Sequence, residues 1–281
     1  MLISVSHVTR YTYDEPARYA IQALRLTPPH FEGQRVLDWT VRAPGIEKAI
    51  HFVDGYGNGA VLVTYAEEHT EIEIVAEGVV ETTDSAGIVR GLPETAPARI
   101  YMRETPATKP DDGIRKIAQS LTGATELDRL HALMDLIRDQ IEYETGATTA
   151  ISTASEVLAQ GRGVCQDHAH VFISAARCLG IPARYVNGYY LSGAGMPEPA
   201  HHAWAEAKVA HLGWVGFDVA NRVCPDAHYI RLAAGLDALS ASPIRGSRPG
   251  ASGAAERLIV VVNVREHQGM QQQQQQQQLP E

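Results

Sequence analysis

The chain has 281 residues, of which 44% are hydrophobic and 20% charged, so it has the composition of a globular protein and enough length for two domains. Its formal net charge of −9 and its pI near 5.7 argue against nucleic acid or an anionic membrane surface as the main partner. Three widely spaced cysteines do not make a disulfide framework, no stretch is long enough to cross a membrane, and residues 1–10 lack the features of a signal peptide. We therefore expect a cytoplasmic protein.

The first 84 residues consist of short β-rich runs separated by turn sequences. Thr27-Pro28-Pro29 and the glycine-rich segment at residues 54–59 are typical turns. The predicted strands are residues 2–13, 20–26, 35–41, 50–53, 60–65 and 70–82. We predict an N-terminal antiparallel β domain over residues 1–84, a small sandwich or barrel. Since it has no clustered nucleophile, metal-ligand spacing or phosphate loop, we expect it to frame a site rather than carry chemistry.

A change of composition separates this domain from a helical region. Residues 85–112 contain four prolines and no sustained periodicity, as a linker does. Apolar residues then recur at three- and four-residue spacing over residues 114–121 and 127–141, which predicts two helices. Thr153 followed by Glu156 is a capping box and predicts a third, short helix. We assign residues 113–268 to a second domain.

The next segment combines a buried helix with a cysteine in its first turn. Apolar residues recur at helical spacing over residues 171–179, and Gly180 is a typical C-terminal cap. Two glycines precede Cys165, which would begin the helix, where free backbone N–H groups and the helix dipole favour a thiolate. Cys165 is therefore predicted to be a reactive, accessible thiol. Cys178 and Cys224 are predicted to have structural roles.

A base and a carboxylate lie further along the chain. Residues 199–209 alternate small apolar residues with larger polar ones and predict a strand, and residues 214–218 predict a second strand that ends at Asp218. An antiparallel hairpin of even-sum register would place His202 and Asp218 on one face, with the imidazole free to face Cys165. His201 points to the opposite face of its strand from His202, so only one of the two is expected to face the thiol.

Three segments resemble the core motifs of the bacterial transglutaminase-like family, which has the papain-like cysteine protease fold. They are Gly163-Val164-Cys165-Gln166-Asp167-His168-Ala169-His170, His202-Ala203-Trp204-Ala205-Glu206 and Gly213-Trp214-Val215-Gly216-Phe217-Asp218. The resemblance places the catalytic Cys, His and Asp of the family at Cys165, His202 and Asp218, and it selects His202 over His201. Val219 replaces the proline that many members carry after the Asp. The resemblance extends to the N-terminal β domain and implies an α+β fold, with helices packed on an antiparallel sheet in the second, catalytic domain.

The resemblance implies thiol-dependent acyl transfer on amide or glutamine carboxamide bonds of a protein or peptide substrate. A primary amine as acceptor would make the protein a transglutaminase, and water would make it a cysteine peptidase or amidase; the triad alone does not distinguish the two. A non-catalytic binding module on this fold and a metal-dependent hydrolase are the other classes left open. We expect no nucleic-acid or membrane partner, and the sequence predicts no particular oligomeric state.

No cofactor or metal ion is expected. Asp167, His168 and His170 are potential metal ligands beside Cys165, but on a helix the two histidines point about 200° apart and the set would not converge on one ion. No Asp-x-Asp-x-Asp-Gly run indicates a calcium loop. We expect Asp167 or His168 to form hydrogen bonds at the start of the helix instead.

The oxyanion formed during acyl transfer needs hydrogen-bond donors. The backbone N–H of Cys165 is the expected first donor, because the oxyanion develops next to the sulfur at a helix N-terminus. The side chains of Tyr143 and Gln160 are the candidates for the second donor, and the sequence does not separate them.

The C-terminal part of the chain has three predicted features. The glycine- and proline-rich loop at residues 192–199 is expected to be a mobile rim beside the base. The apolar run at residues 258–262, within 256–265, predicts a buried closing strand. Residues 269–281, which include eight consecutive glutamines, predict a disordered tail.

Overall fold

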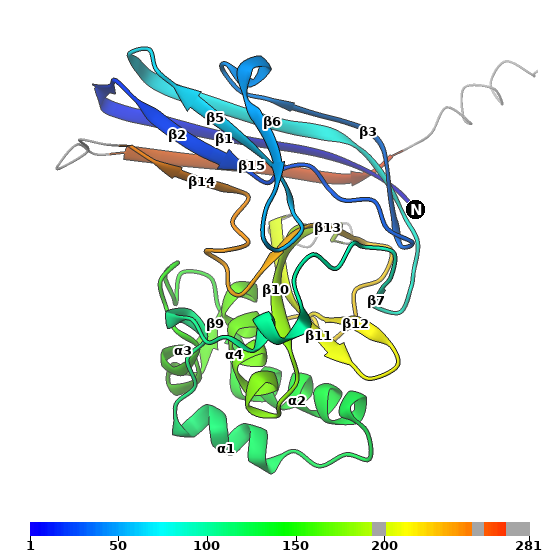
Figure 1. Cartoon of the computed structure of the whole chain (residues 1–281). Helices are drawn as coiled ribbons and strands as arrows, with labels where there is room; N and C mark the ends of the chain where they lie inside the picture. The colour runs from blue at the N-terminus through cyan, green and yellow to red at the C-terminus, as the bar shows by residue number, and fades with distance from the viewer. Residues whose placement is uncertain (193–200, 249–255, 268–281) are drawn as a thin grey trace, which may run out of the picture.

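The computed structural model describes residues 1–192, 201–248 and 256–267. A β-sandwich packs on a second domain of helices and an antiparallel sheet, which lies below it in Figure 1. Except for residue 192, the predicted loop rim lies outside the described residues, and so does the predicted glutamine tail.

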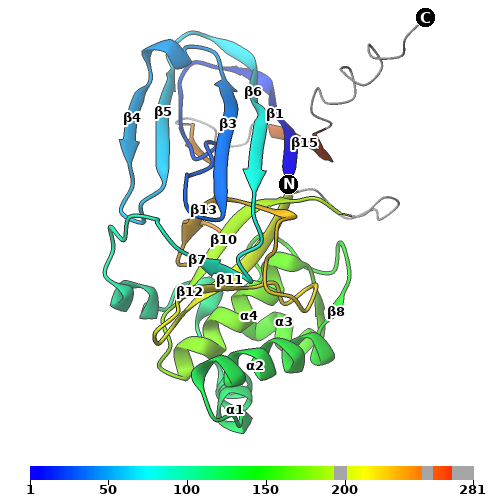
Figure 2. The ribbon, with the colours of Figure 1, turned by 90° about the vertical axis from the view of Figure 1, so that its right-hand side faces the viewer.

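The sandwich consists of two four-stranded antiparallel sheets, in the orders β15-β1-β6-β3 and β14-β2-β5-β4, seen from the side in Figure 2. Alternate residues of β1 are buried, as expected for a strand with one face on a core. All six strands predicted for the N-terminal domain are confirmed. The strands of the sandwich are β1 (Leu2–Ala17), β2 (Ala20–Leu24), β3 (Gln34–Arg42), β4 (Ile50–Val53), β5 (Gly59–Tyr65), β6 (His69–Thr82), β14 (Ile244–Ser247) and β15 (Glu256–Glu266), with the short helix η1 (Ile46–Lys48) before β4.

The end of the chain returns to this sandwich. β14 pairs with β2, and β15 pairs with β1 over the range from Ile3 opposite Glu266 to Tyr13 opposite Glu256. Both segments fall within residues 113–268, which the sequence predicts to be the second domain, but their strands pair with those of the sandwich. The predicted burial of residues 258–262 is wrong: Leu258 is 52% exposed and Val261 49%. The reason is that β15 forms an edge of its sheet, with β1 on one side only.

The second domain is organised around α4, whose residues 167–177 are all buried. α4 packs against β10 and β11 on one side and against α1, α2 and α3 on the other (Figures 1 and 2). The four predicted helices are confirmed, including the Thr153 and Glu156 capping box. The helices are α1 (Asp112–Ser120), α2 (Glu126–Gln140), α3 (Ala154–Gln160) and α4 (Cys165–Cys178).

The sheet of this domain has the order β13-β10-β11-β12-β7. Its strands are β7 (Ile88–Val89), β10 (Ala183–Tyr190), β11 (His201–Val209), β12 (Gly213–Phe217) and β13 (Tyr229–Gly235), and a separate parallel pair is formed by β8 (Glu142–Tyr143) and β9 (Arg162–Gly163). The predicted linker contains β7 and the short helices η2 (Ala98–Met102) and η3 (Pro106–Thr108). It is packed on the domain, because the guanidinium of Arg177 donates to the carbonyl of Tyr101 at 2.7 Å and to the hydroxyl of Thr108 at 2.7 Å.

Two side-chain amides join the sandwich to the edge of this sheet. Gln34 accepts from the N–H of Arg231 at 2.7 Å and donates to its carbonyl at 2.9 Å. Asn58 makes the same reciprocal pair with the N–H and carbonyl of Ala234, both at 2.8 Å. Each amide therefore satisfies the backbone of β13 as a neighbouring strand would. The sheet that carries the predicted site is thus held at a fixed position under the sandwich.

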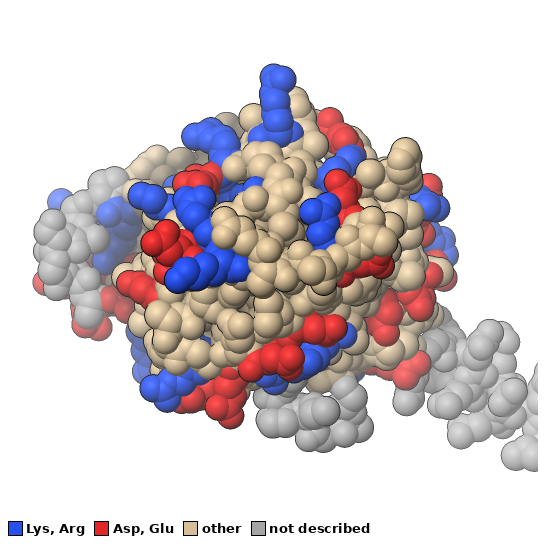
Figure 3. Space-filling view, turned by 90° about the horizontal axis from the view of Figure 1, so that it is seen from below, with Lys and Arg blue, Asp and Glu red and all other residues tan. Residues whose placement is uncertain are grey.

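The surface of the second domain carries mixed charge. Viewed from below, Lys and Arg side chains are interspersed with Asp and Glu, so this face does not present one sign of charge (Figure 3). Among the described residues, no helix is both long and apolar enough to span a membrane.

Candidate active site

Cys165 is the first residue of α4, and Val164 is its N-cap. The carboxylate of Asp167 accepts from the N–H of Val164 at 2.8 Å and from the hydroxyl of Thr148 at 2.6 Å, which fixes the first turn of the helix. Gly163 allows this approach, since a Cβ at that position would lie 2.7 Å from Oδ2 of Asp167. The backbone conformation therefore presents the thiol at the N-terminal end of a buried helix, where the dipole favours negative charge.

The neighbouring acidic and imidazole groups have separate partners. His168 places Nδ1 at 2.9 Å from the carbonyl of Val164 and Nε2 at 3.1 Å from that of Ile141. His170 accepts from the N–H of Ala238 at 3.1 Å, and burial lowers the pKa of His170 to about 4. The prediction that Asp167 or His168 forms hydrogen bonds at the helix start is confirmed. Asp167, His168 and His170 contact different groups and do not converge on one point.

His202 and Asp218 meet at the ends of β11 and β12. The strands pair with Ala205 opposite Phe217, which is the even-sum register that places His202 and Asp218 on one face. Nε2 of His202 lies 2.6 Å from Oδ2 of Asp218, and both residues are buried. This contact leaves Nδ1 of the imidazole for Cys165.

The electrostatics of this pair favour its charged form. Burial is the largest single influence on the pKa of His202 and acts to lower it, but the charge and hydrogen bond of Asp218, together with the interactions with Cys165, outweigh burial and raise the pKa. The interactions with Cys165 are a hydrogen bond to its thiol and an interaction with its charge. Burial acts to raise the pKa of Asp218, yet His202, Tyr229 and Asn221 together hold it below its ordinary value. The imidazolium and the carboxylate therefore stabilise each other.

The three predicted residues thus lie together, and the other two cysteines do not join them. Cys165, Cys178 and Cys224 are all free thiols and are partly buried. Burial raises the pKa of Cys178 and that of Cys224, so both are held in the unreactive thiol form. This matches the structural roles predicted for them.

Sequence reasoning missed two residues that hold Asp218. The hydroxyl of Tyr229 donates to Oδ2 of Asp218 at 2.7 Å, and the amide of Asn221 donates to the same oxygen at 2.8 Å. Asn221 lies three residues after Asp218, in a turn where Arg222 has a φ of 56°. An Asn in a turn just after Asp218 is a local sequence signal for a hydrogen bond to that carboxylate. Tyr229, in contrast, lies on β13 and is brought to Asp218 by tertiary structure alone.

A cavity of about 580 Å³ adjoins the thiol. It is lined by Tyr143, Thr145, Val164, Cys165, His201 and by Val260, Val261 and Val262 of β15. Tyr143 therefore lies beside the thiol, whereas the amide of Gln160 donates to the carbonyl of Ala147 at 2.9 Å and is not among the lining residues. Of the two candidates for the second oxyanion donor, the geometry favours Tyr143.

His201 differs from its expected position. It was predicted to face away from the thiol, but it lines the same cavity as Cys165. Its ring lies 5.9 Å from that of His7, and its Nε2 has no hydrogen-bond partner among the described residues. Burial and the neighbouring His202 lower the pKa of His201 to about 4. His201 is thus held neutral, while His202 carries the contacts to Asp218 and Cys165.

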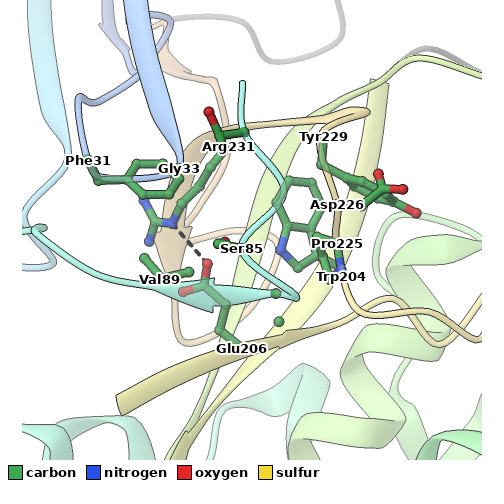
Figure 4. A pocket seen from close by; sticks show the side chains of 13 residues that line it. Phe31, Gly33, Ser85, Val89, Trp204, Glu206, Pro225, Asp226, Tyr229 and Arg231 are labelled. Carbon is green, nitrogen blue, oxygen red and sulfur yellow. Dashed lines mark hydrogen bonds and ion pairs between the residues drawn. The ribbon is translucent and has the colours of Figure 1, made fainter. Parts of the chain in front are cut away.

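A second, smaller cavity of about 40 Å³ lies behind the site, where the two domains meet. Figure 4 shows Arg231 reaching Glu206 on one side of it and Trp204 with Tyr229 on the other. Glu206 is fully buried and accepts from Arg231 at 2.9 Å and from Arg184 at 2.5 Å. This network fixes the face of β11 that also carries His202.

The fold and the site together define a class of protein. A helix that begins at Cys165 packs on an antiparallel sheet that carries His202 and Asp218, which is the arrangement of the papain-like fold. A crystal structure of a candidate cysteine protease from Cytophaga hutchinsonii superimposes with a TM-score of 0.72 at 23% identity, and the match covers 95% of this chain and 91% of that chain. This likeness shows a shared fold over nearly the whole chain.

Comparison of sequences identifies the family. The model of the transglutaminase-like superfamily matches residues 115–219, and the model of the bacterial transglutaminase-like N-terminal region matches residues 3–81. An uncharacterised Mycobacterium leprae protein is 28% identical over 280 residues, which covers 92% of this chain and 96% of that protein. A similar protein of Mycobacterium tuberculosis H37Rv is 26% identical over 275 residues, or 86% of each. The chain belongs to the bacterial transglutaminase-like family, a thiol-based catalytic family.

Proposed function

We propose that the protein is a thiol-dependent acyltransferase that acts on amide or glutamine carboxamide groups of a protein or peptide. One observation carries this proposal. The imidazole of His202 is held by Asp218 at 2.6 Å on one nitrogen and interacts with Cys165, at the N-terminus of α4, on the other. A nucleophile, a base and an orienting carboxylate in this sequence of contacts are the parts that covalent acyl transfer requires.

In the first step the thiolate of Cys165 attacks the carbonyl carbon of the donor. The oxyanion that forms is stabilised by the backbone N–H of Cys165 and by the side chain of Tyr143, which lines the same cavity. Protonated His202 then gives its proton to the departing nitrogen, the C–N bond breaks, and ammonia or an amine leaves. A thioester between Cys165 and the acyl group remains.

In the second step neutral His202 takes a proton from the acceptor, which attacks the thioester and releases the thiolate. A primary amine gives a new amide, and water gives a carboxylate. Hydrolysis is a second candidate activity, because the thiol is partly exposed and two residues that line its cavity, Val260 and Val261, are each 49% exposed, so that water reaches it.

The first test is the rate at which iodoacetamide alkylates Cys165 as a function of pH. We expect alkylation to persist near pH 6, well below the value of about 8.5 at which free cysteine is half ionised. His202→Ala should slow alkylation at that pH about tenfold or more, because the thiolate loses its imidazolium partner. Peptide mapping of the alkylated protein identifies the modified thiol.

Cys224 serves as the control within the same sample, since burial raises its pKa and no imidazole activates it. If Cys165 and Cys224 were alkylated at the same rate at every pH, the catalytic pair would not be formed, and the fold would serve as a binding module. Amine incorporation and ammonia release measured on carboxamide donors, with Cys165→Ala as the blank, then separate transfer from hydrolysis.

A further inference from the structure

β15 presents an open edge. Its strand partner among the described residues is β1, and it ends the order β15-β1-β6-β3. The N–H of His267 donates to the carbonyl of Leu2 at 2.8 Å, and the direction of the backbone groups alternates along an antiparallel ladder. The odd-numbered residues of β15 therefore bond to β1. The N–H and C=O groups of Leu258, Val260 and Val262 point away from it.

The composition of this edge is unusual for a strand that faces solvent. Residues 258–264 contain no charged side chain, and the side chains at 258–261 are 38–52% exposed. The opposite edge of the same sheet, β3, instead carries Arg35 and Arg42, both in ion pairs. Proteins normally protect an exposed edge with charges, because an apolar edge pairs readily with another chain. The edge of β15 is therefore suited to bind an added strand.

The same edge borders the candidate active site. Val260, Val261 and Val262 form one wall of the cavity of about 580 Å³, and Val164 and Cys165 lie on another wall. In Figure 1 β15 runs along the side of the sandwich nearest the second domain. A strand added to β15 would lie about 4.8 Å from it and so would enter this cavity. The volume is within the range of about 300 to 1,000 Å³ found for ligand sites.

We propose that the acyl donor is an extended peptide segment that pairs with the open edge of β15 as an added strand and thereby presents its reactive carbonyl to Cys165. The inference rests on the proposed function and names the substrate of that function: a peptide in which uncharged, β-branched residues flank the reactive residue. Main-chain hydrogen bonds supply the affinity, and alternate side chains contact the apolar walls. A second copy of this chain is disfavoured as occupant, since pairing of two β15 strands would close the cavity that holds the thiol.

Val260→Pro tests the proposal, because it removes an N–H that points to the open edge and leaves the bonds to β1 in place. Two donors are compared: a peptide with one Gln between Val and Ile residues, and a blocked Gln-Gly dipeptide too short to pair. We expect the ratio of kcat/KM for the peptide to kcat/KM for the dipeptide to fall about tenfold. The matched control is Val53→Pro. Val53 lies on β4, an edge strand of the other sheet, and is 64% exposed.

The backbone of Val53 points away from its partner strand as well, since the N–H of the adjacent Asp54 donates to the carbonyl of Asn58. The ratio should be unchanged in Val53→Pro. An equal fall in both variants, or no fall in Val260→Pro, would overturn the proposal. So would light scattering that shows a dimer in the native chain and a monomer in Val260→Pro, because the edge would then belong to a second copy.

A binding measurement separates this inference from the proposed function and does not depend on the folding of the proline variant. The labelled peptide is titrated into Cys165→Ala, and N-methyl groups are placed on alternate peptide nitrogens. Methylation of the nitrogens that face β15 should weaken binding about tenfold, and methylation of the intervening nitrogens should not. If the peptide binds with this alternation but neither donor is turned over, the proposed function fails and the docking holds. Equal effects of both methylation patterns, or no binding, would exclude strand addition.

Discussion

Asp218 is buried at 0% exposure and yet holds a negative charge, because its two oxygens accept several hydrogen bonds. His202, Tyr229 and the amide of Asn221 all donate to Oδ2, at 2.6, 2.7 and 2.8 Å. A carboxylate satisfied in this way tolerates burial and fixes the imidazole in one orientation. The pKa of Asp218 is lowered and that of His202 raised. The charged pair therefore stabilises the folded state at pH values above the ordinary pKa of an Asp. This stabilisation is lost at high pH, when His202 gives up its proton.

Tyr229→Phe should reveal a positioning role for this hydroxyl. The variant removes one donor to Asp218, so the pKa of Asp218 rises and activity is lost at a higher pH on acidification. We also expect kcat to fall about tenfold, because the imidazole is held less firmly. The measurement is the pH profile of turnover or of Cys165 alkylation. A lower rate with an unmoved acid limb would indicate that Tyr229 acts only on packing.

At this scale Cys165, His202 and Asp218 could be predicted because their motifs are local in sequence. Tyr229 could not, because it reaches Asp218 from β13, whose position depends on pairing with β10 and on a register shift between Asn187 and Gly188. Strict alternation of side chains along a strand also fails to predict the location of His201, because this residue lies at the first position of β11. The catalytic roles of the three residues remain predictions that the alkylation experiment tests.

At the scale of elements, the helices and the first six strands follow from periodicity, capping and turns. β13 has the sequence Tyr-Ile-Arg-Leu-Ala-Ala-Gly and is buried throughout, so it lacks the alternation that marks a half-exposed strand. β14 is short and three of its four residues are exposed. The pairing of β15 with β1 joins the two ends of the chain, and such long-range pairing leaves no local pattern. The elements and pairings that the sequence does not predict are therefore those that depend on tertiary contacts.

The contact between the sandwich and β13 should depend on Asn58. Asn58→Ala leaves the N–H and carbonyl of Ala234 without their partner and removes two bonds to Asp54. We expect the free energy of unfolding to fall by roughly 2 to 4 kcal/mol, since buried backbone groups lose hydrogen bonds without gaining water. Urea unfolding of the variant measures this. Asn263→Ala, at an exposed position on β15, is the matched control, and an equal loss in the two variants would contradict the role given to Asn58.

The whole molecule is held together by a shared core at the junction of its two domains. Tyr189, Ile230 and Leu232 of the second domain lie in the hydrophobic core of the sandwich. His7 of β1 is buried beside them and contacts the hydroxyl of Tyr189 at 2.9 Å, while its ring lies 5.9 Å from that of His201. The cavity beside Cys165 is likewise built from both domains, because β15 belongs to the sandwich sheet and α4 to the second domain. Folding of the sandwich and completion of the site are therefore coupled.

Three largely buried histidines, two of which (His7 and His201) meet at this junction, should make the molecule sensitive to acid. Burial lowers the pKa values of His7, His170 and His201 to about 4, so all three are neutral in the folded chain, whereas the unfolded chain binds protons near pH 6.5. The contribution of these three histidines to stability is then complete above pH 6.5 and falls as the pH drops from 6.5 toward 4, because the unfolded state takes up more protons. The expected loss is on the order of 2 kcal/mol per histidine at pH 5.

Urea unfolding at pH 7.5 and pH 5 checks this in the native chain and in His7→Gln. The variant should lose less stability between the two pH values than the native chain, whatever its stability at pH 7.5, because one proton-binding difference has been removed. His51→Gln, at an exposed position on β4, should retain the native pH dependence. If His7→Gln kept the native slope as well, the buried histidine at the junction would not be the source of acid sensitivity. A shallower slope would instead show that protonation of the buried His7 opposes folding.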